Sequence, residues 1–509
     1  MTDNPPRSTQ AITGSKRWLA FLAATFGSAS QVLTLAVSGG ALPYMQGAFS
    51  AAPDQMAWVL TSFVIGTTVA TAFSGWLATR FGRKRFYLVS AAGFTIATMM
   101  CGFATSLSQA VLFRTLQGMF SAPLSPLGQA IVLDCFAREK QGFAVGVWSL
   151  GSVSGALIGP YIGGLLVEAH GWPWLFFLTM PASAMAFVMC WAFVPDVPPD
   201  RGRHLGFVGF GAIVVAISAM QLALNRGERL DWFDSTEIVI EIAVATIAFY
   251  LFVAHTALAR RPFVDRSLFV NRNYAIGAAL IFVFGALNFL QMFMIPVLLQ
   301  TLGGYTIVDS GYFLGWRAAG LILSMLILVP VIDRIDVRLS FVGGFLFQVA
   351  SAWSMSRWTL DIRGTDVAFT IFLQGVCSGI AFIPITMMAF STLPARLRDD
   401  GAAMFFLMMT LGTATGTAAI FNVLTRSIKI NREELGAQIS VFGSVFRHGA
   451  APHPTERLAS LDAEVLRQSA MIAYNNSFLL IAVATLAVLP LAVFVRMPKA
   501  KAMDKAADS

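Results

Sequence analysis

The sequence predicts an all-α polytopic membrane protein, from its composition, its long apolar runs and the placement of its basic residues. Of its 509 residues, 56% are hydrophobic and 12% are charged, whereas soluble domains carry about 25% charged residues. The mean hydropathy is +0.70. A chain this apolar has too few polar residues to cover a water-facing surface, so most of it faces lipid or other membrane helices.

Fourteen apolar runs are long enough to span a bilayer, which takes about 20 residues in a helix. They predict spans over 18–40, 56–78, 86–105, 109–133, 142–167, 173–194, 206–224, 236–257, 274–299, 309–331, 339–357, 366–392, 402–427 and 470–495. The runs over 206–224 and 236–257 are short, and Glu237 and Glu241 enter the second. Without those two, the count falls to twelve. The first run follows basic residues, as in a signal peptide, but it is predicted to be a retained helix because it is long enough to span the bilayer and many similar runs follow.

The basic residues predict the orientation. With both termini in the cytoplasm, the cytoplasmic segments hold 23 Lys and Arg and the short external loops hold four. This bias follows the positive-inside rule and predicts cytoplasmic termini. The net charge of +8 is therefore interpreted as a topology signal, and no nucleic-acid partner is expected. The four cysteines have no metal-ligand spacing, so neither a metal site nor a disulfide is expected.

Two short basic turns indicate an internal repeat. GWLATRFGRKR (75–85) joins the second and third predicted spans, and VPVIDRIDVR (329–338) joins the tenth and eleventh. Each lies between the second and third helices of a six-helix set. Two related halves are typical of secondary transporters.

Several motifs resemble those of the major facilitator superfamily. GWLATRFGRKR is similar to its loop motif, LFRTLQG (112–118) to its motif with an intramembrane arginine, and GSVSGALIGPYIGG (151–164) to its antiporter motif. LALNRGERLDWFDS (222–235) and RPFVDRSLFVNRN (261–273) resemble segments of EmrB/QacA-type drug:proton antiporters. The resemblance implies a major facilitator fold, with two six-helix bundles and two extra central helices.

The expected organisation follows from that resemblance and from the spans. It places a cytoplasmic N-terminus at 1–17, a first bundle at 18–194, a linker with two extra helices at 195–273, a second bundle at 274–496 and a cytoplasmic C-terminus at 497–509. A periplasmic loop is expected over 428–468. It is a candidate for contact with a periplasmic adaptor protein; an inert cover is the alternative.

The chain departs from the family pattern at five positions. Thr34 stands where relatives carry an acidic residue in the first helix, and Gly39 stands where they carry asparagine. Thr79 replaces the usual aspartate of the loop motif, although Asp333 and Arg334 remain in its second copy. Gln374 and Met409 stand where late helices often carry arginine. These changes concern the proton site and the substrate contacts, not the fold.

Glycines four apart on the fifth predicted span form one ridge. Such a ridge lets a neighbouring backbone approach closely, and Pro160 removes one backbone donor. The antiporter interpretation is a tight contact between the two halves; generic helix packing is the alternative. The motif residues are Gly151, Gly155, Gly159, Pro160, Gly163 and Gly164. The resemblance also implies a cytoplasmic gate at Gly75, Arg80, Gly82, Arg83, Lys84, Asp333 and Arg334.

Polar residues within apolar runs are candidates for a substrate or proton pathway. Arg114 lies mid-membrane, where a cation is costly unless it faces a cavity or a partner; Arg317 poses the same question, with snorkelling as the alternative. Asn288 and Gln291 are three apart and share a helix face. With Gln117 and Arg114 opposite, they predict a polar-to-basic cavity for neutral or anionic amphiphiles. The predicted pathway comprises Arg114, Gln117, Thr34, Asn288, Gln291, Glu168 and Arg317.

No acid clearly replaces the one missing at Thr34. Asp134 and Glu168 lie at predicted helix ends, and Glu241 lies in an extra helix. A coupling carboxyl should be partly desolvated so that it titrates in the working range. A solvated charge at a helix end is the alternative for the first two.

The predicted function is proton-coupled efflux of lipophilic small molecules from the cell inner membrane, without a bound cofactor. A carrier of one metabolite or siderophore, or a proton-driven uptake symporter, are alternatives on the same fold. An enzyme is not expected, because a membrane haem enzyme needs facing histidine pairs and only His255 lies near a membrane run. A channel would not need the two-halves design.

Overall fold

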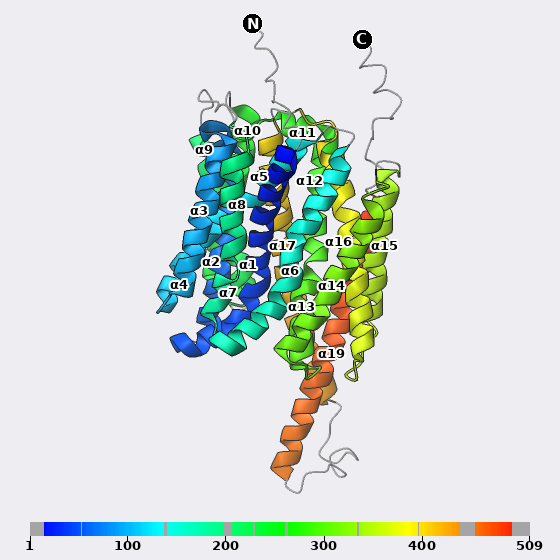
Figure 1. Cartoon of the computed structure of the whole chain (residues 1–509). Helices are drawn as coiled ribbons and strands as arrows, with labels where there is room; N and C mark the ends of the chain where they lie inside the picture. Colours follow the sequence, from blue (N-terminus) through cyan, green and yellow to red (C-terminus); the bar gives the residue numbers. More distant parts are fainter. Residues whose placement is uncertain are drawn as a thin grey trace.

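A computed structural model describes residues 15–51, 53–136, 140–196, 206–227, 230–259, 263–332, 335–394, 397–437 and 454–490. Within these ranges the secondary structure is helical, and the helices stand side by side in one bundle-like body (Figure 1). Helix α1 begins and α19 ends near the same end of this body. We call that end the terminal face and the other end the opposite face.

The first bundle is built from the N-terminal third of the chain. Its helices are α1 (Ser15–Phe49), α2 (Pro53–Phe81), α3 (Arg83–Gly102), α4 (Leu107–Ser121), α5 (Leu124–Cys135), α6 (Gln141–His170), α7 (Pro173–Phe177) and α8 (Met180–Phe193). Helices α4 and α5 form one broken span, interrupted at Ala122 and Pro123. The interruption fits proline chemistry, since proline lacks the backbone donor that continues a helix.

Two further helices follow the first bundle. Helix α9 (Phe207–Arg226) packs against α10 (Thr236–Leu258), and α9 also contacts α2 and α17 (Arg398–Ala437). Arg226 at the end of α9 donates a 2.9 Å hydrogen bond to Glu241 of α10 and also pairs with Glu237. These ion pairs account for the two acids that enter the second apolar run. The predicted helices over 206–224 and 236–257 are thus present in the fold.

The second bundle repeats the six-helix pattern. Its remaining helices are α11 (Ser267–Val270), α12 (Arg272–Asn288), α13 (Leu290–Thr301), α14 (Ile307–Leu328), α15 (Val337–Met355), α16 (Gly364–Phe390) and α19 (Pro454–Val488). Helices α12 and α13 form one span broken at Phe289.

Local chemistry sets several helix starts. Gly82 precedes α3 with a φ of +94°, a conformation that costs glycine little and other residues more. Thr306 and Asp309 form a reciprocal capping box at the start of α14, which satisfies two backbone donors that the helix leaves open. The Asn271 side chain accepts from the Tyr274 backbone and caps α12.

The described helices match the predicted runs closely. Each of the fourteen predicted ranges overlaps one helix or one broken pair. Within the described residues, ten helices are both long and apolar enough to cross a membrane. The fold class is therefore confirmed, while the number of spans and the side of the termini stay predictions.

The predicted external loop over 428–468 is largely helical where it is described. Helix α17 continues to Ala437 and α19 begins at Pro454, so both extend past the bundle at the opposite face (Figure 1). Arg432 of α17 pairs with Asp462 of α19 at 2.7 Å, and Asn431 donates to the backbone of Ser469. These contacts make the described flanks of the loop two paired helical arms.

Helix packing repeats between the two bundles. Helix α1 packs along α6 just as α12 packs along α17, and α2 along α4 just as α14 along α16. Glycines mark equivalent close approaches: a Cβ at Gly66 would lie 2.5 Å from the Thr115 carbonyl oxygen, and one at Gly320 would lie 2.1 Å from that of Phe372. The bundles contact each other through α6 with α14 and α2 with α17. The repeat seen in the two basic turns thus extends to the helix packing.

Candidate functional site

A central cavity of about 550 Å³ lies between the two bundles. This volume is within the range of small-molecule sites. Its walls come from α1, α2, α5, α6 and α9 on one side and from α12, α13, α14, α16 and α17 on the other. The lining is mainly apolar and aromatic, including Phe63, Phe284, Phe289, Phe293, Met292, Phe382, Phe406, Met409 and Phe421. Methionine and aromatic faces accommodate varied lipophilic shapes.

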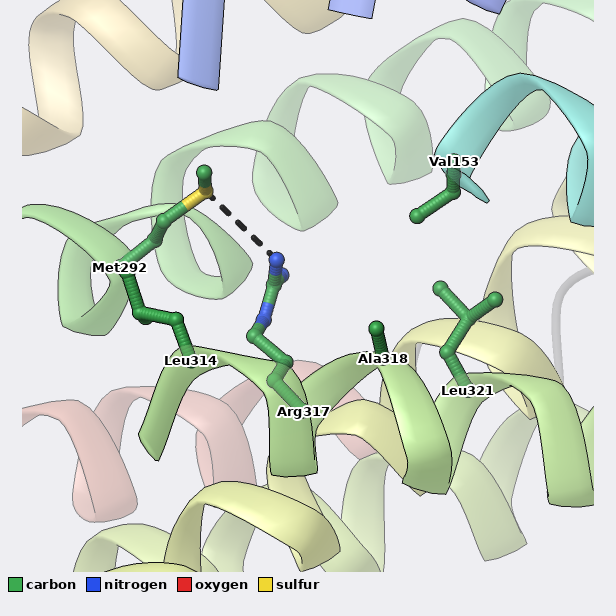
Figure 2. Close-up of a pocket in the computed structure, with 6 residues that line it drawn as sticks. All are labelled: Val153, Met292, Leu314, Arg317, Ala318 and Leu321. Carbon is green, nitrogen blue, oxygen red and sulfur yellow. Dashed lines mark hydrogen bonds between the residues drawn. The ribbon is translucent and has the colours of Figure 1, made fainter. Parts of the chain in front are cut away.

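One buried arginine of the second bundle faces this cavity. Arg317 of α14 donates to Asn288 Oδ1 at 2.7 Å and to Ser378 Oγ at 3.2 Å. Its other terminal nitrogen contacts the Met292 sulfur at 3.5 Å. Figure 2 shows the guanidinium rising from α14 toward Met292, with Val153 of α6 across a small recess of about 20 Å³. The predictions that Asn288 and Arg317 belong to one site therefore agree with this geometry.

The first bundle contributes a second polar patch. Ser28 and Gln31 of α1 and Ser125 of α5 line the cavity, and the Ser125 hydroxyl donates to Gln31 Oε1. On α6, the Trp148 Nε1 and the Ser149 hydroxyl are buried in the lining without a hydrogen-bond partner in the described part of the chain. Buried polar groups are usually paired, so these two are ready contacts for a ligand.

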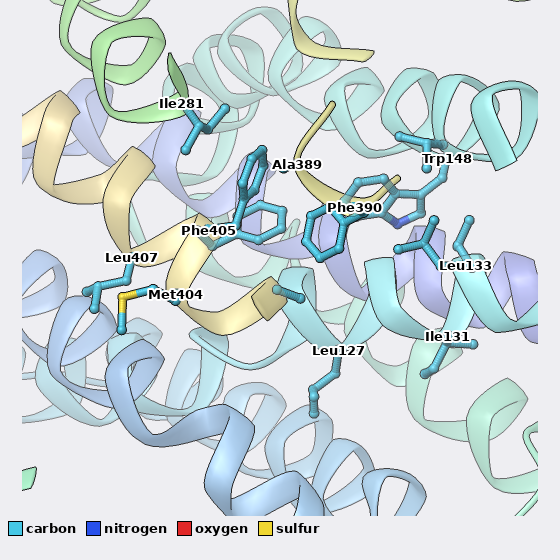
Figure 3. Close-up of a cluster of buried hydrophobic side chains, with 14 of the residues drawn as sticks. Leu127, Ile131, Leu133, Trp148, Ile281, Ala389, Phe390, Met404, Phe405 and Leu407 are labelled. Carbon is cyan, nitrogen blue, oxygen red and sulfur yellow. The ribbon is translucent and has the colours of Figure 1, made fainter. Parts of the chain in front are cut away.

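Apolar side chains from both bundles close the cavity toward the terminal face. One large buried cluster includes Leu127 and Trp148 of the first bundle with Phe390 and Phe405 of the second (Figure 3). Trp148 also meets Phe406 edge to face, with ring centroids 6.4 Å apart. A smaller cluster joins α14 to Val147, Leu150 and Val153 of α6.

Toward the opposite face, the core divides between the bundles. One buried cluster there is built from first-bundle residues, including Leu33, Met45 and Phe176. Another comes from the second bundle, including Met294, Trp358 and Phe478. The bundles are therefore joined by apolar packing on the terminal side of the cavity, and the conformation is closed at the terminal face.

An ion bridge reinforces this closure. Asp134, at the end of α5, pairs with Arg83 at the start of α3 and accepts a 2.7 Å hydrogen bond from Arg398 at the start of α17. Arg83 and Asp134 belong to the first bundle, and Arg398 belongs to the second. Arg83, which is predicted to be a gate residue, therefore shares Asp134 with Arg398. Neither Asp134 nor Arg398 was predicted as part of the gate.

Two predicted pathway residues lie inside the first bundle rather than in the cavity lining. Arg114 is buried, donates to the Val59 carbonyl and to Gln117 Oε1, and lies 4.4 Å from the Phe63 ring centroid. Gln117 in turn donates to Thr98. Neither residue is in the cavity lining, so the prediction that they face Asn288 across the cavity is wrong. Sequence patterns do not tell which side of a helix meets its own bundle.

Gln291 and Thr34 also point away from the cavity lining. Gln291 accepts from Gln348 Nε2 at 3.0 Å and contacts the Met355 sulfur, both within the second bundle. The expectation that Asn288 and Gln291 share a face assumed one continuous helix, and the break at Phe289 separates them. Thr34 is buried and donates to the Ser30 carbonyl.

The glycine ridge of α6 packs within its own bundle, not between the halves. A Cβ at Gly151 would lie 2.3 Å from the Thr25 methyl, and one at Gly155 would lie 2.7 Å from the Ala29 carbonyl oxygen, both on α1. Gly163 similarly meets Leu175. The inter-bundle face of α6 instead carries Gly146, whose Cβ would lie 2.3 Å from Val329. Gly159 is buried in α6.

Other predicted residues are placed as follows. Gly75 is buried in α2 and its carbonyl accepts from Thr79, while Arg80 and Lys84 are half-buried on either side of Gly82. Asp333 and Arg334 lie outside the described residues. The side-chain surroundings of Pro160, Gly164 and Glu168 are also outside the description. The roles proposed for all these residues stay predictions.

The cavity lining that the structure describes contains no Asp, Glu or His, and Arg317 is its one charged residue. Sequence reasoning missed Gln31, Ser125 and Ser378. Gln31 carried a signal, since it precedes Thr34 by one helical turn. Ser378 carried none, because hydroxyl residues are common in membrane helices.

Comparison with known proteins identifies the family. The sequence profile described as Major Facilitator Superfamily matches residues 23–417. The chain is 28% identical to "Probable multidrug resistance protein EmrY" of Escherichia coli (strain K12), over 97% of this chain and 98% of that protein. It is 28% identical to "Multidrug export protein EmrB" of Haemophilus influenzae, over 97% and 99% respectively. The solved structure of the proton:xylose symporter XylE superposes with a TM-score of 0.60 at 15% identity, covering 94% of this chain and 96% of that one.

Proposed function

The chain belongs to the major facilitator superfamily and is a membrane transporter, and from that premise we propose that it exports lipophilic or amphiphilic small molecules by proton-coupled alternating access. The observation that carries this proposal is the cavity of about 550 Å³ between the bundles, with apolar and aromatic walls. Such a chamber holds a drug-sized apolar body and offers a few polar groups for orientation. The two similar full-length relatives are named as multidrug proteins, in agreement with this substrate class.

Alternating access requires that the two bundles rock around the cavity. The closure at the terminal face suits this motion, because its apolar cluster includes residues of both bundles and its Arg398–Asp134 bond joins one bundle to the other. We propose that the contacts between the bundles break when the terminal face opens, while the packing within each bundle persists. The conformation described here is the one from which an exporter releases its substrate.

The coupling proton needs a titratable group, and the described cavity lining offers no carboxyl. We assign this role to Asp134, which is held by two arginines when the terminal face is closed. Opening the terminal face breaks the bond to Arg398 and leaves the Asp134 carboxylate with Arg83 alone. We propose that proton binding at Asp134 accompanies this opening step and that no further cofactor is required.

We place the protein in the cell inner membrane, with the terminal face in the cytoplasm, following the 23-to-4 bias of basic residues. The paired arms of α17 and α19 would then lie in the periplasm. We keep the proposal that they contact an adaptor protein, since they project past the bundle (Figure 1).

The test is substrate efflux with and without a proton gradient. A panel of neutral, anionic and cationic amphiphiles is supplied to an efflux-deficient bacterial host that produces the protein. Active compounds are then followed in everted membrane vesicles, where export appears as accumulation when the interior is acidified. Ala414→Trp fills the cavity from α17, whereas Thr415→Trp places the same bulk on a neighbouring exposed position outside the lining.

The proposal predicts gradient-dependent accumulation of several amphiphiles that Ala414→Trp abolishes and Thr415→Trp retains. Transport of a single compound from the panel would favour a dedicated metabolite carrier. Accumulation in right-side-out vesicles with an acidic exterior would instead indicate uptake. Absence of transport for every compound would refute the proposal.

A further inference from the structure

Arg317 is a buried cation without a counter-charge. The residue is 8% exposed, and no carboxylate of the described residues forms an ion pair with it. Its hydrogen-bond acceptors are the neutral side chains of Asn288, Ser378 and Met292, and its Nε is buried without a partner in the described part of the chain. Membrane-embedded cations normally pair with an acid or face a ligand pathway, and Arg317 lines the cavity.

Arg114 is the other buried arginine of the described membrane helices, and its surroundings differ. It is 1% exposed, lies outside the cavity lining and donates to Gln117 and to the Val59 carbonyl of its own bundle. The contrast separates the two arginines: one is enclosed by its bundle, and the other reaches the chamber.

The space around Arg317 has two parts of different chemistry. The recess of about 20 Å³ beside the guanidinium is bounded by Val153, Met292, Leu314, Ala318 and Leu321, and it has room for one small polar group. It shares Val153, Met292, Arg317 and Leu321 with the central cavity. The adjoining chamber of about 550 Å³ is lined mostly by apolar groups. This arrangement fits a molecule with a small anionic head and a long apolar body.

On this basis we propose that Arg317 is the binding site for the carboxylate of an amphiphilic monocarboxylic acid, whose apolar chain occupies the central cavity. The planar guanidinium fork matches a carboxylate, and charge-assisted hydrogen bonds are the stronger kind. Asn288 and Ser378 hold the arginine in place, since both accept from its Nη2. This inference rests on the proposed export function and names its preferred substrate class.

The binding test uses the full chain in phosphatidylcholine vesicles with a matched pair of quenchers, 11-bromoundecanoate and 11-bromoundecanol. Both carry the same tail and quench tryptophan fluorescence, and Trp148 and Trp232 line the cavity. Unbrominated dodecanoate or dodecanol is added as a competitor. It displaces probe bound in the cavity but not probe dissolved in the lipid, so the two sources of quenching are distinguished. A repeat in vesicles containing phosphatidylglycerol reports whether an anionic lipid headgroup occupies the same site.

The variants are Arg317→Gln, which removes the charge, and Arg317→Lys, which keeps the charge without the fork. Arg357→Gln removes an exposed arginine that lies over Trp353, away from the cavity, and serves as the matched charge control. We expect Arg317→Gln to weaken competable bromoundecanoate binding at least about tenfold, as for loss of a charged hydrogen bond, and to leave bromoundecanol binding unchanged. Arg317→Lys should lie between, and Arg357→Gln should match the native protein.

Retained bromoundecanol binding shows that the Arg317→Gln cavity is intact; if that variant fails to fold, Arg317→Lys carries the comparison. Equal losses for the acid and the alcohol, or no loss for either, would overturn the carboxylate site while leaving amphiphile export standing. Competition by phosphatidylglycerol alone, without dodecanoate, would assign the site to lipid and overturn the substrate assignment. A native protein that binds neither probe would refute both this inference and the amphiphile cavity.

Discussion

Replacing Arg398 by alanine should open the terminal face. This change removes the bond between Arg398 of the second bundle and Asp134 of the first, but it leaves the Arg83–Asp134 pair inside the first bundle. The fold of each bundle should therefore persist, while the balance between the closed and open conformations moves toward open.

The magnitude follows from the shielding of the pair. The Arg398 and Asp134 side chains are 14% and 19% exposed, so their bond should exceed the ~0–1 kcal/mol of a surface pair. It should fall short of the ~3 kcal/mol reached by buried hydrogen bonds to charged groups. We expect about 1–2 kcal/mol, which changes the ratio of closed to open molecules by roughly 5- to 30-fold.

Distances between spin labels measure this ratio. Labels at the exposed positions Lys140 and Leu339 report separation of the two bundles at the terminal face. Asp196→Asn is the matched control, because it breaks an exposed pair with Arg85 in the same bundle at the same face. An Arg398→Ala distribution indistinguishable from those of the native protein and of Asp196→Asn would show that the ion bridge does not hold the gate.

Three further predictions concern packing, the extra helices and the cysteines. Gly155→Leu and Gly416→Leu should each lower the free energy of unfolding by about 1–3 kcal/mol through overpacking, because a Cβ would lie 2.7 Å from Ala29 O and 2.3 Å from Ala286 O. Thermal unfolding measures this, with Gly343→Ala as the control, because no atom lies within 4 Å of a Cβ at Gly343. An equal loss of stability at all three sites would show that Gly155 and Gly416 are not close-packed. Glu241→Gln should destabilise the α9–α10 pair by about 1 kcal/mol, more than Glu237→Gln does, because the Glu241 side chain is 16% exposed and that of Glu237 is 65% exposed. Limited proteolysis of the loop between these helices measures which variant is cleaved faster. Faster cleavage of the Glu237→Gln variant would refute the prediction. All four cysteines are buried and free, so N-ethylmaleimide should modify them much faster in denatured than in native protein by mass spectrometry, and rapid native modification of Cys190 or Cys377 would contradict the packing around them.

Much of the fold could be predicted from the sequence because its signals are local. Run length and hydropathy located the helices, including α9 and α10, since every backbone group in lipid must be paired within a helix. The motif residues also indicated the family, which the sequence profile confirms.

The site was predicted only in part, because the three-dimensional packing of the helices decides which side chains point into the cavity. Arg317 and Asn288 do meet at the cavity, but Gln291 turns inward after the break at Phe289. Arg114 seemed the better cavity candidate from its mid-membrane place, yet its own bundle encloses it. Likewise, the α6 glycines signalled close packing correctly but not which helix they pack against.

The ion pair at the gate could not be predicted from the sequence either, because its two residues are distant along the chain. Asp134 and Arg398 are 264 residues apart, and each alone resembles a solvated charge at a helix end. Only the folded structure brings them together as a bond between the two bundles.

Sided labelling of one cavity cysteine tests whether a single chamber opens to alternate faces of the protein. Thr413, in the α17 part of the lining, is replaced by cysteine in a protein whose four native cysteines are alanine, and a membrane-impermeant maleimide is applied to each side of oriented vesicles. We expect labelling from the opposite face in the native background, and added labelling from the terminal face once Arg398→Ala opens the gate. Labelling from both faces at equal rates in the native background, or from neither face in both, would contradict it.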